Sequence, residues 1–162
     1  MTIIKALFKT VASLLIPVGE ACIQCARVEN GKNDSFLGPY TKCLKLCQRC
    51  ATQMKPIRAP ICHQCGRQMD RSSHSICFDC KRIPDRYVES NRSAFQYEGV
   101  TKELLTVFKF RGRESLARPL ALVIEQVIRE HYRDVRFDGL LYEPIHPSRK
   151  YERGFNQTQL IA

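Results

Sequence analysis

The sequence predicts a small zinc-binding module followed by an α/β domain, and two observations support this fold class. Eight of the nine cysteines form four Cys-x-x-Cys pairs, all in the first half of the 162-residue chain. The second half has no cysteine and combines short apolar segments with amphipathic helical patterns. We therefore expect an amphipathic helix at residues 1–18, a double zinc ribbon at residues 19–82 and an α/β domain at residues 83–162.

The expected helix at residues 1–18 rests on apolar side chains that recur at the helical period: Ile4, Leu7, Phe8, Val11, Leu14 and Leu15. Pro17 and Gly19 mark its end. Lys9 interrupts the apolar stretch, which makes it a poor signal peptide. No run in the chain reaches the roughly 18 apolar residues that a membrane span requires. The sequence therefore predicts a cytoplasmic protein without a membrane span.

The cysteine pairs predict two structural zinc sites. The pairs are Cys22/Cys25, Cys47/Cys50, Cys62/Cys65 and Cys77/Cys80. A two-residue gap lets one tight turn aim two sulfurs at a single ion, and two such turns complete the tetrahedral shell of Zn²⁺. A disulfide framework is the disfavoured alternative, because it belongs to secreted chains. Cys43 is left over, and it either replaces Cys47 as a ligand or, as the two-residue gap favours, is a spare, partly buried thiol.

The formal net charge of +10 is typical of proteins that bind nucleic acid, but zinc changes this count. Eight bound thiolates and two Zn²⁺ ions together subtract four charges, which leaves about +6. The overall charge is therefore weak evidence for nucleic-acid binding, and local clusters of cations matter more.

The second half predicts strand, helix, helix and strand, the order that opens a parallel crossover unit. Residues 92–97 (RSAFQY) have a strand pattern, and Thr101 can cap the helix that follows. That helix carries Leu104, Leu105, Val107 and Phe108. The second helix fits Pro119–Tyr132, with an apolar stripe at Leu120, Val123, Ile124, Val127 and Ile128. Residues 138–145 (DGLLYEPI) then predict a short buried strand. A parallel sheet needs several strands and is covered on both faces, so the two strands predicted here are few for such a sheet.

Residues 146–157 (HPSRKYERGFNQ) follow the second predicted strand, at the edge where open α/β sheets bind ligands. Arg149 and Arg153 can grip phosphate oxygens in a bidentate way. Asn156 and Gln157 can cap the next helix or bond a sugar hydroxyl. A basic surface loop leading into a helix explains the same residues equally well.

A second basic cluster, formed by Lys109, Arg111 and Arg113, surrounds Phe110. Cations beside an aromatic ring can hold a nucleic-acid strand by phosphate contact and base stacking. Cations and a glycine are also common at the carboxyl end of a helix. A solvated helix end is therefore the alternative interpretation of this cluster.

The order of these motifs resembles the ComF family of phosphoribosyltransferase-related proteins. The resemblance rests on the four cysteine pairs followed by RSAFQYEG, KFRGR and EPIHPSRKYERGFNQTQLIA. It implies a double zinc ribbon followed by the amino-terminal part of a type I phosphoribosyltransferase-like domain with a Rossmann-like parallel sheet. It also implies DNA uptake during natural competence, partners in the competence machinery, and binding of single-stranded DNA and phosphoribosyl pyrophosphate. The latter ligand would contact Arg149, Arg153, Asn156 and Gln157.

One part of that family fold is missing from the sequence. A type I phosphoribosyltransferase holds ribose and its 5-phosphate with two adjacent acidic residues and a Thr/Gly-rich loop. This chain has no two adjacent acidic residues and stops at Ala162. We expect either a truncated reading frame, which is favoured, or a partner chain that completes the fold. We also expect no transferase turnover in this form, with Mg²⁺ bound only in a complete fold. The alternative function is a zinc-ribbon module that binds single-stranded nucleic acid or protein.

Overall fold

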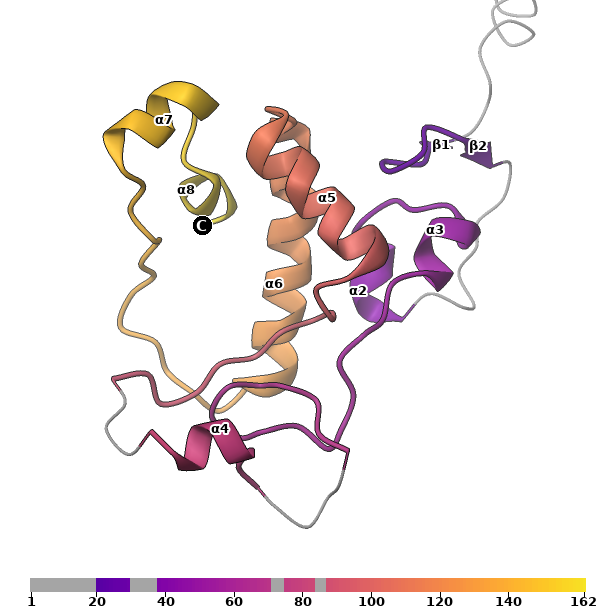
Figure 1. The fold of residues 1–162 in the computed structure, drawn as a ribbon. Coiled ribbons are helices and arrows are strands. Elements are labelled where there is room, and N and C mark those ends of the chain that lie inside the picture. Colours follow the sequence, from indigo (N-terminus) through magenta and orange to yellow (C-terminus); the bar gives the residue numbers. More distant parts are fainter. Residues whose placement is uncertain (1–19, 30–37, 71–74, 84–86) are drawn as a thin grey trace, which may run out of the picture.

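The computed structural model describes residues 20–29, 38–70, 75–83 and 87–162, and the predicted helix at residues 1–18 lies outside them. The described chain is mainly helical (Figure 1). Its elements are β1 (Glu20–Ala21), β2 (Val28–Glu29), α2 (Pro39–Lys42), α3 (Gln48–Thr52), α4 (Phe78–Lys81), α5 (Gly99–Phe110), the 3-10 helix η1 (Glu114–Leu116), α6 (Ala117–His131), α7 (Pro147–Arg153) and α8 (Gln157–Ile161). No helix in these ranges is both long and apolar enough to cross a membrane.

The helices α5 and α6 lie where the sequence predicts them. The expected cap was wrong, because Glu98 is the N-cap of α5 and Thr101 lies buried in its first turn. Gly112 follows the end of α5 with φ of +64°, the left-handed conformation that commonly terminates a helix. Pro119 lies in the first turn of α6, where its missing N–H costs little.

The core of the molecule joins the first ribbon, which carries Cys22, Cys25, Cys47 and Cys50, to these two helices. The second ribbon carries Cys62, Cys65, Cys77 and Cys80. One apolar cluster contains Leu104 and Phe108 of α5 together with Val123 and Val127 of α6. The first ribbon adds its own buried side chains to the same cluster: Cys22, Leu44, Leu46, Cys47, Cys50, Ala51 and Met54. Figure 1 shows this ribbon beside α5, whereas α4 of the second ribbon lies at the other end of the molecule.

The predicted parallel sheet is not present in the described residues. Regular pairing there is limited to β1 and β2, which are antiparallel. Residues 92–97 are extended, and Phe95 forms an antiparallel bridge with Pro56. Ile57 N donates to Ala94 O at 2.9 Å, and Gln96 N donates to Lys55 O at 2.8 Å. This segment therefore pairs along one edge with the linker between the two ribbons, and that edge is not available to a parallel strand.

Residues 138–145 were also wrongly predicted, because they form an exposed extended segment instead of a buried strand. The side chains of Leu140 and Leu141 are 66% and 96% exposed. Within the described residues no strand lies beside this segment, so its backbone has no ladder partner. Its apolar side chains instead line an open groove of about 530 Å³ with parts of α6 and α8.

The last two helices are anchored to this extended segment and to α5. Asn156 caps α8 by accepting hydrogen bonds from the N–H groups of Thr158 and Gln159, and its Nδ2 donates to Glu143 O at 3.1 Å. Phe155 packs on Phe108, with ring centroids 5.7 Å apart. These contacts hold α7 opposite the carboxyl end of α5.

Candidate metal centres and a basic cleft

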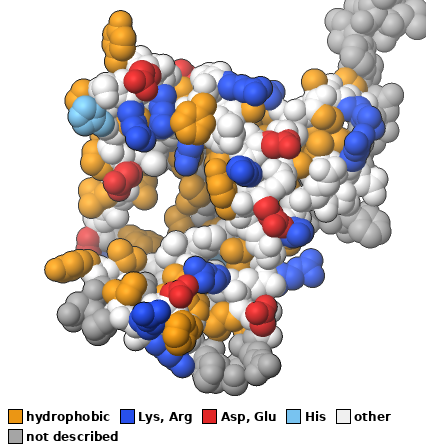
Figure 2. Space-filling view, in the orientation of Figure 1, with side chains coloured by type: hydrophobic (Ala, Val, Ile, Leu, Met, Phe, Trp, Pro, Cys, Tyr) orange, Lys and Arg blue, Asp and Glu red, His pale blue; other side chains and the backbone are white. Residues whose placement is uncertain are grey.

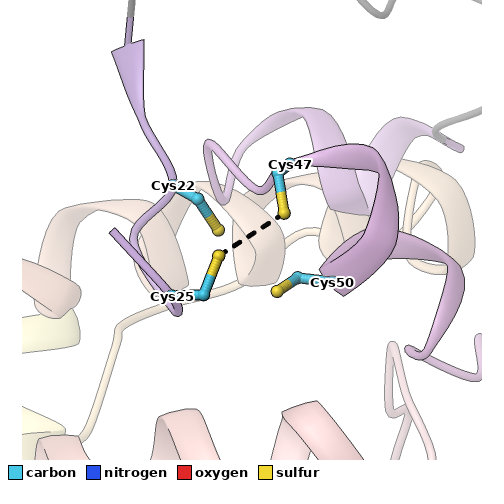
Figure 3. A group of neighbouring side chains, drawn as sticks. All are labelled: Cys22, Cys25, Cys47 and Cys50. Atoms are coloured by element: carbon cyan, nitrogen blue, oxygen red, sulfur yellow. Dashed lines mark hydrogen bonds between the residues drawn. The ribbon is translucent and has the colours of Figure 1, made fainter. Parts of the chain in front are cut away.

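The first predicted set of cysteines comes together between β1, β2 and α3 (Figure 3). The sulfurs of Cys22, Cys25, Cys47 and Cys50 all lie within 4.8 Å of one another, and they point inward. The sulfurs of Cys25 and Cys47 are 3.6 Å apart. A tetrahedral zinc ion with Zn–S bonds of about 2.3 Å places its sulfurs about 3.8 Å apart, whereas a disulfide requires about 2.05 Å. The geometry therefore fits zinc.

The second predicted set comes together in the same way. Its members are Cys62, Cys65, Cys77 and Cys80, again with all sulfurs within 4.8 Å. The sulfurs of Cys65 and Cys77 are 3.8 Å apart, and Cys77 N donates to the sulfur of Cys62 at 3.3 Å. Backbone N–H donors of this kind stabilise a thiolate. Both sets have four thiol donors, which fills the zinc shell and leaves no open position for catalysis.

Two features of the second set's surroundings fix its position. Gly66 follows Cys65 with φ of +70°, a left-handed conformation that glycine adopts readily in a tight turn. A Cβ at Gly66 would lie 2.4 Å from Asn91 O, so the chain passes very close to this turn. Asn91 N donates to Gln64 O at 2.6 Å, and Arg92 donates to His63 O at 2.8 Å. The second ribbon is thereby clamped to the segment that leads into α5.

Cys43 belongs to neither metal-binding group. Its side chain is partly buried, as expected for a spare thiol. Burial and then the negative charge of Glu125 raise the pKa of this thiol. Cys47, and not Cys43, thus completes the first set.

The electrostatics of both sets favour a bound cation. Burial opposes ionisation of Cys22 and Cys62, yet neighbouring backbone N–H groups lower the pKa of Cys22 to about 7 and that of Cys62 to about 6. Burial and then the neighbouring thiols raise the pKa of Cys50, and they raise the pKa of Cys80 to about 12. Four such close thiolates cannot all ionise unless a cation balances their charge. A Zn²⁺ ion in each set would supply that balance.

A basic cleft lies between the carboxyl end of α5 and α7. Its volume is about 820 Å³, and its lining consists of Lys109, Phe110, Arg111, Gly112, Arg149, Glu152 and Arg153. Figure 2 shows Lys and Arg side chains gathered over this part of the molecule. Four cations and one carboxylate give the lining a net charge of +3. The cleft therefore suits a ligand with several negative charges.

Arg153 is held in place inside this cleft. Its guanidinium carbon lies 4.8 Å from the centre of the Phe110 ring, a cation–π contact. Its Nη1 donates to Oε1 of Gln157 at 3.1 Å. A guanidinium carries five N–H donors, so this bond leaves four for a ligand. Nε2 of Gln157 is buried without a hydrogen-bond partner in the described residues.

The structure distributes the predicted ligand residues unevenly. The cleft unites Lys109 and Arg111 of one predicted cluster with Arg149 and Arg153 of the other, whereas Arg113 is not part of its lining. Asn156 and Gln157 are buried and serve as helix cap and as partner of Arg153. Sequence reasoning missed Glu152 and the pairing of Phe110 with Arg153, for which no local pattern exists.

Comparison with known proteins points to one relative. The chain is similar to the competence protein ComFC of Bacillus subtilis (strain 168), with 36% identity over 121 residues. The match covers 73% of this chain and 50% of ComFC, so the chain spans about half the length of that relative. No family model and no solved structure matches the chain. The match confirms the resemblance to the ComF family, and the two Cys₄ groups fit its double zinc ribbon.

Proposed function

We propose that this ComF-like chain takes part in DNA handling during competence, and that its basic cleft binds single-stranded DNA. The observation that carries the proposal is the union of two basic segments in one cleft with a net charge of +3. The similarity to a competence protein supports the same role, and proteins of the competence machinery are the proposed partners. A cytoplasmic location is part of the proposal, because eight of the cysteines form two Cys₄ groups that can hold a metal ion, an arrangement that needs reduced thiols.

A single strand is favoured over a duplex because of the aromatic ring in the cleft. Phe110 is 65% exposed, and Arg153 stacks on one of its faces. An exposed ring can stack on an unpaired base, while neighbouring cations contact the phosphates. In a duplex the bases are already stacked on one another, so the ring would contribute nothing.

A phosphorylated sugar is a second candidate ligand, favoured by the size of the cleft and by Arg153. Cavities of about 300 to 1,000 Å³ are typical of small-molecule sites, and a guanidinium fork matches phosphate geometry. Phosphoribosyl transfer would further require acidic groups that position Mg²⁺ and the ribose, and Glu152 is the single carboxylate in the lining. We therefore propose weak binding of phosphoribosyl pyrophosphate without turnover.

In this proposal the zinc sites have a structural role. Each closed Cys₄ shell contributes folding free energy on the order of 10 kcal/mol, which is comparable with the stability of a whole domain. The first site lies in the core beside α5, whose last residues line the cleft. Zinc thus supports ligand binding through the fold and does not itself contact the ligand.

The test is a titration of labelled oligothymidylate at several salt concentrations. Replacing both Lys109 and Arg111 with Ala should weaken binding and lower the salt slope by about 1.4, or 0.7 for each lost phosphate contact. Lys102→Ala is the matched control, because this exposed lysine lies on the same helix away from the cleft. An equal loss of slope in the control and in the double variant would refute the cleft as the site.

A further inference from the structure

We infer that single-stranded DNA and a phosphorylated sugar exclude each other, because both occupy the same basic cleft. The inference rests on the proposed function and adds a relation between its two candidate ligands. The sequence places the two basic clusters far apart, at residues 109–113 and 149–153. In the folded chain Lys109 and Arg111 line the same cavity as Arg149 and Arg153.

The charge of the cleft is sufficient for one polyanion and not for two. Its lining has a net charge of +3. One phosphomonoester carries close to two negative charges, and a diphosphate on the same sugar adds more. A strand brings one negative charge per nucleotide, so three or four successive phosphates neutralise the lining. Once either ligand is bound, a second anion meets no remaining positive charge.

Arg153 makes the exclusion geometric as well as electrostatic. Phe110 and Gln157 hold its guanidinium, so it cannot turn toward a second ligand without losing both contacts. A guanidinium fork grips one phosphate group in a bidentate way. Arg153 also covers one face of the Phe110 ring, so an unpaired base can stack only on the other face. Strand and sugar phosphate therefore require the same donors.

The experiment follows anisotropy of labelled oligothymidylate on the full 162-residue chain while phosphoribosyl pyrophosphate is added to millimolar concentration. Sodium chloride keeps the ionic strength constant, and unphosphorylated ribose is the neutral control. We expect the apparent Kd of the oligonucleotide to rise linearly with the sugar phosphate, without a plateau, and to be unaffected by ribose. Calorimetry on the same samples measures direct binding of the sugar phosphate.

Two variants distinguish a shared site from two separate sites. Arg149→Ala removes an exposed cation of the cleft and should weaken both ligands about tenfold, the size of one charge-assisted hydrogen bond. Lys102→Ala should leave both affinities unchanged.

If the oligonucleotide affinity reaches a plateau, or does not change while calorimetry detects the sugar phosphate, the sites are separate and the inference is wrong. If calorimetry detects no sugar phosphate at millimolar concentration, the inference is also wrong. If the oligonucleotide itself does not bind, the proposed function fails and the inference fails with it.

Discussion

At the scale of single residues, Gly66 and Gly154 share a left-handed backbone and differ in their surroundings. Their φ angles are +70° and +81°. A Cβ at Gly66 would collide with Asn91 O, whereas a Cβ at Gly154 would meet nothing within 4 Å. The two positions therefore separate the cost of backbone strain from the cost of a steric clash.

We predict that Gly66→Ala destabilises the protein by about 2 to 4 kcal/mol, because it adds a backbone clash to the strain. Gly154→Ala should cost only about 1 kcal/mol, the price of a left-handed alanine. Denaturant unfolding of both variants measures the difference. Equal losses of stability would contradict the close contact between the second ribbon and Asn91.

Cys43 and Cys47 provide a second test at this scale. We predict that the wild-type protein carries two zinc ions. Cys47→Ser should lose one of them and Cys43→Ser none, because Cys47 belongs to a Cys₄ group and Cys43 does not. Elemental analysis under reducing conditions gives the stoichiometry. Loss of zinc from Cys43→Ser as severe as that from Cys47→Ser would show that the ligand assignment is wrong.

Tyr40 links the first ribbon to α6 through a hydrogen bond from its hydroxyl to the Glu130 carboxylate. Burial opposes ionisation of Glu130, but hydrogen bonds from Gln126 and Tyr40 and the charge of His131 lower its pKa. A carboxyl group whose pKa is lower in the folded protein than in the unfolded chain stabilises the fold when the pH is above the unfolded-state pKa. This stabilisation is lost as the pH falls through the folded-state pKa.

We therefore predict that Tyr40→Phe costs about 1 kcal/mol at neutral pH, a modest value because Glu130 remains exposed. The difference between wild type and variant should shrink as the pH falls below about 4.3, the ordinary carboxyl pKa. Unfolding curves of both proteins at a series of pH values measure it. A difference that stays constant into the acidic range would argue against the carboxylate as the partner.

At the scale of elements, α5 connects the first zinc site to the cleft. Its buried residues pack in the cluster that contains Cys22, Cys47 and Cys50, and its last residues line the cleft. The second zinc site contributes no residue to that cluster. Loss of zinc from the first site should therefore reduce the helical content more than loss of zinc from the second site.

We predict that Cys47→Ser reduces helical circular dichroism and abolishes oligonucleotide binding, because the core around α5 loses its support. Cys62→Ser should lose its own zinc ion yet keep most of the helical signal and the binding. Circular dichroism and anisotropy of both variants, each with its zinc content measured, provide the comparison. Equal loss of helix in both variants would mean that the ribbons are equally coupled to the core.

The elements also show which parts of the fold the sequence could predict. The helices α5 and α6 depend on local periodicity and on nearby stop signals such as Gly112, and their predicted positions were confirmed within a few residues. The strands depended on remote partners. Residues 92–97 pair with the linker near Pro56, which no local pattern indicates. Residues 138–145 have no neighbouring strand in the described chain.

At the scale of the whole molecule, the same distinction applies to the sites. The two Cys₄ groups could be predicted because each pair is fixed by a two-residue gap, and both sets come together as expected. The cleft could not be predicted as one site, since its two segments approach each other only through packing such as that of Phe108 on Phe155. The cations were recognised, but their common location was not.

We propose that two distant basic segments form one site for single-stranded DNA. Photo-crosslinking of an oligonucleotide that contains 5-iododeoxyuridine, followed by peptide mass spectrometry, locates the bound strand on the chain. We expect cross-linked peptides from both walls of the cleft, residues 109–112 and 149–153, with Phe110 as a principal site. We also expect Arg149→Ala to reduce cross-linking at both walls together. Cross-links confined to the zinc ribbons, with none in either wall, would show that the cleft is not the DNA site.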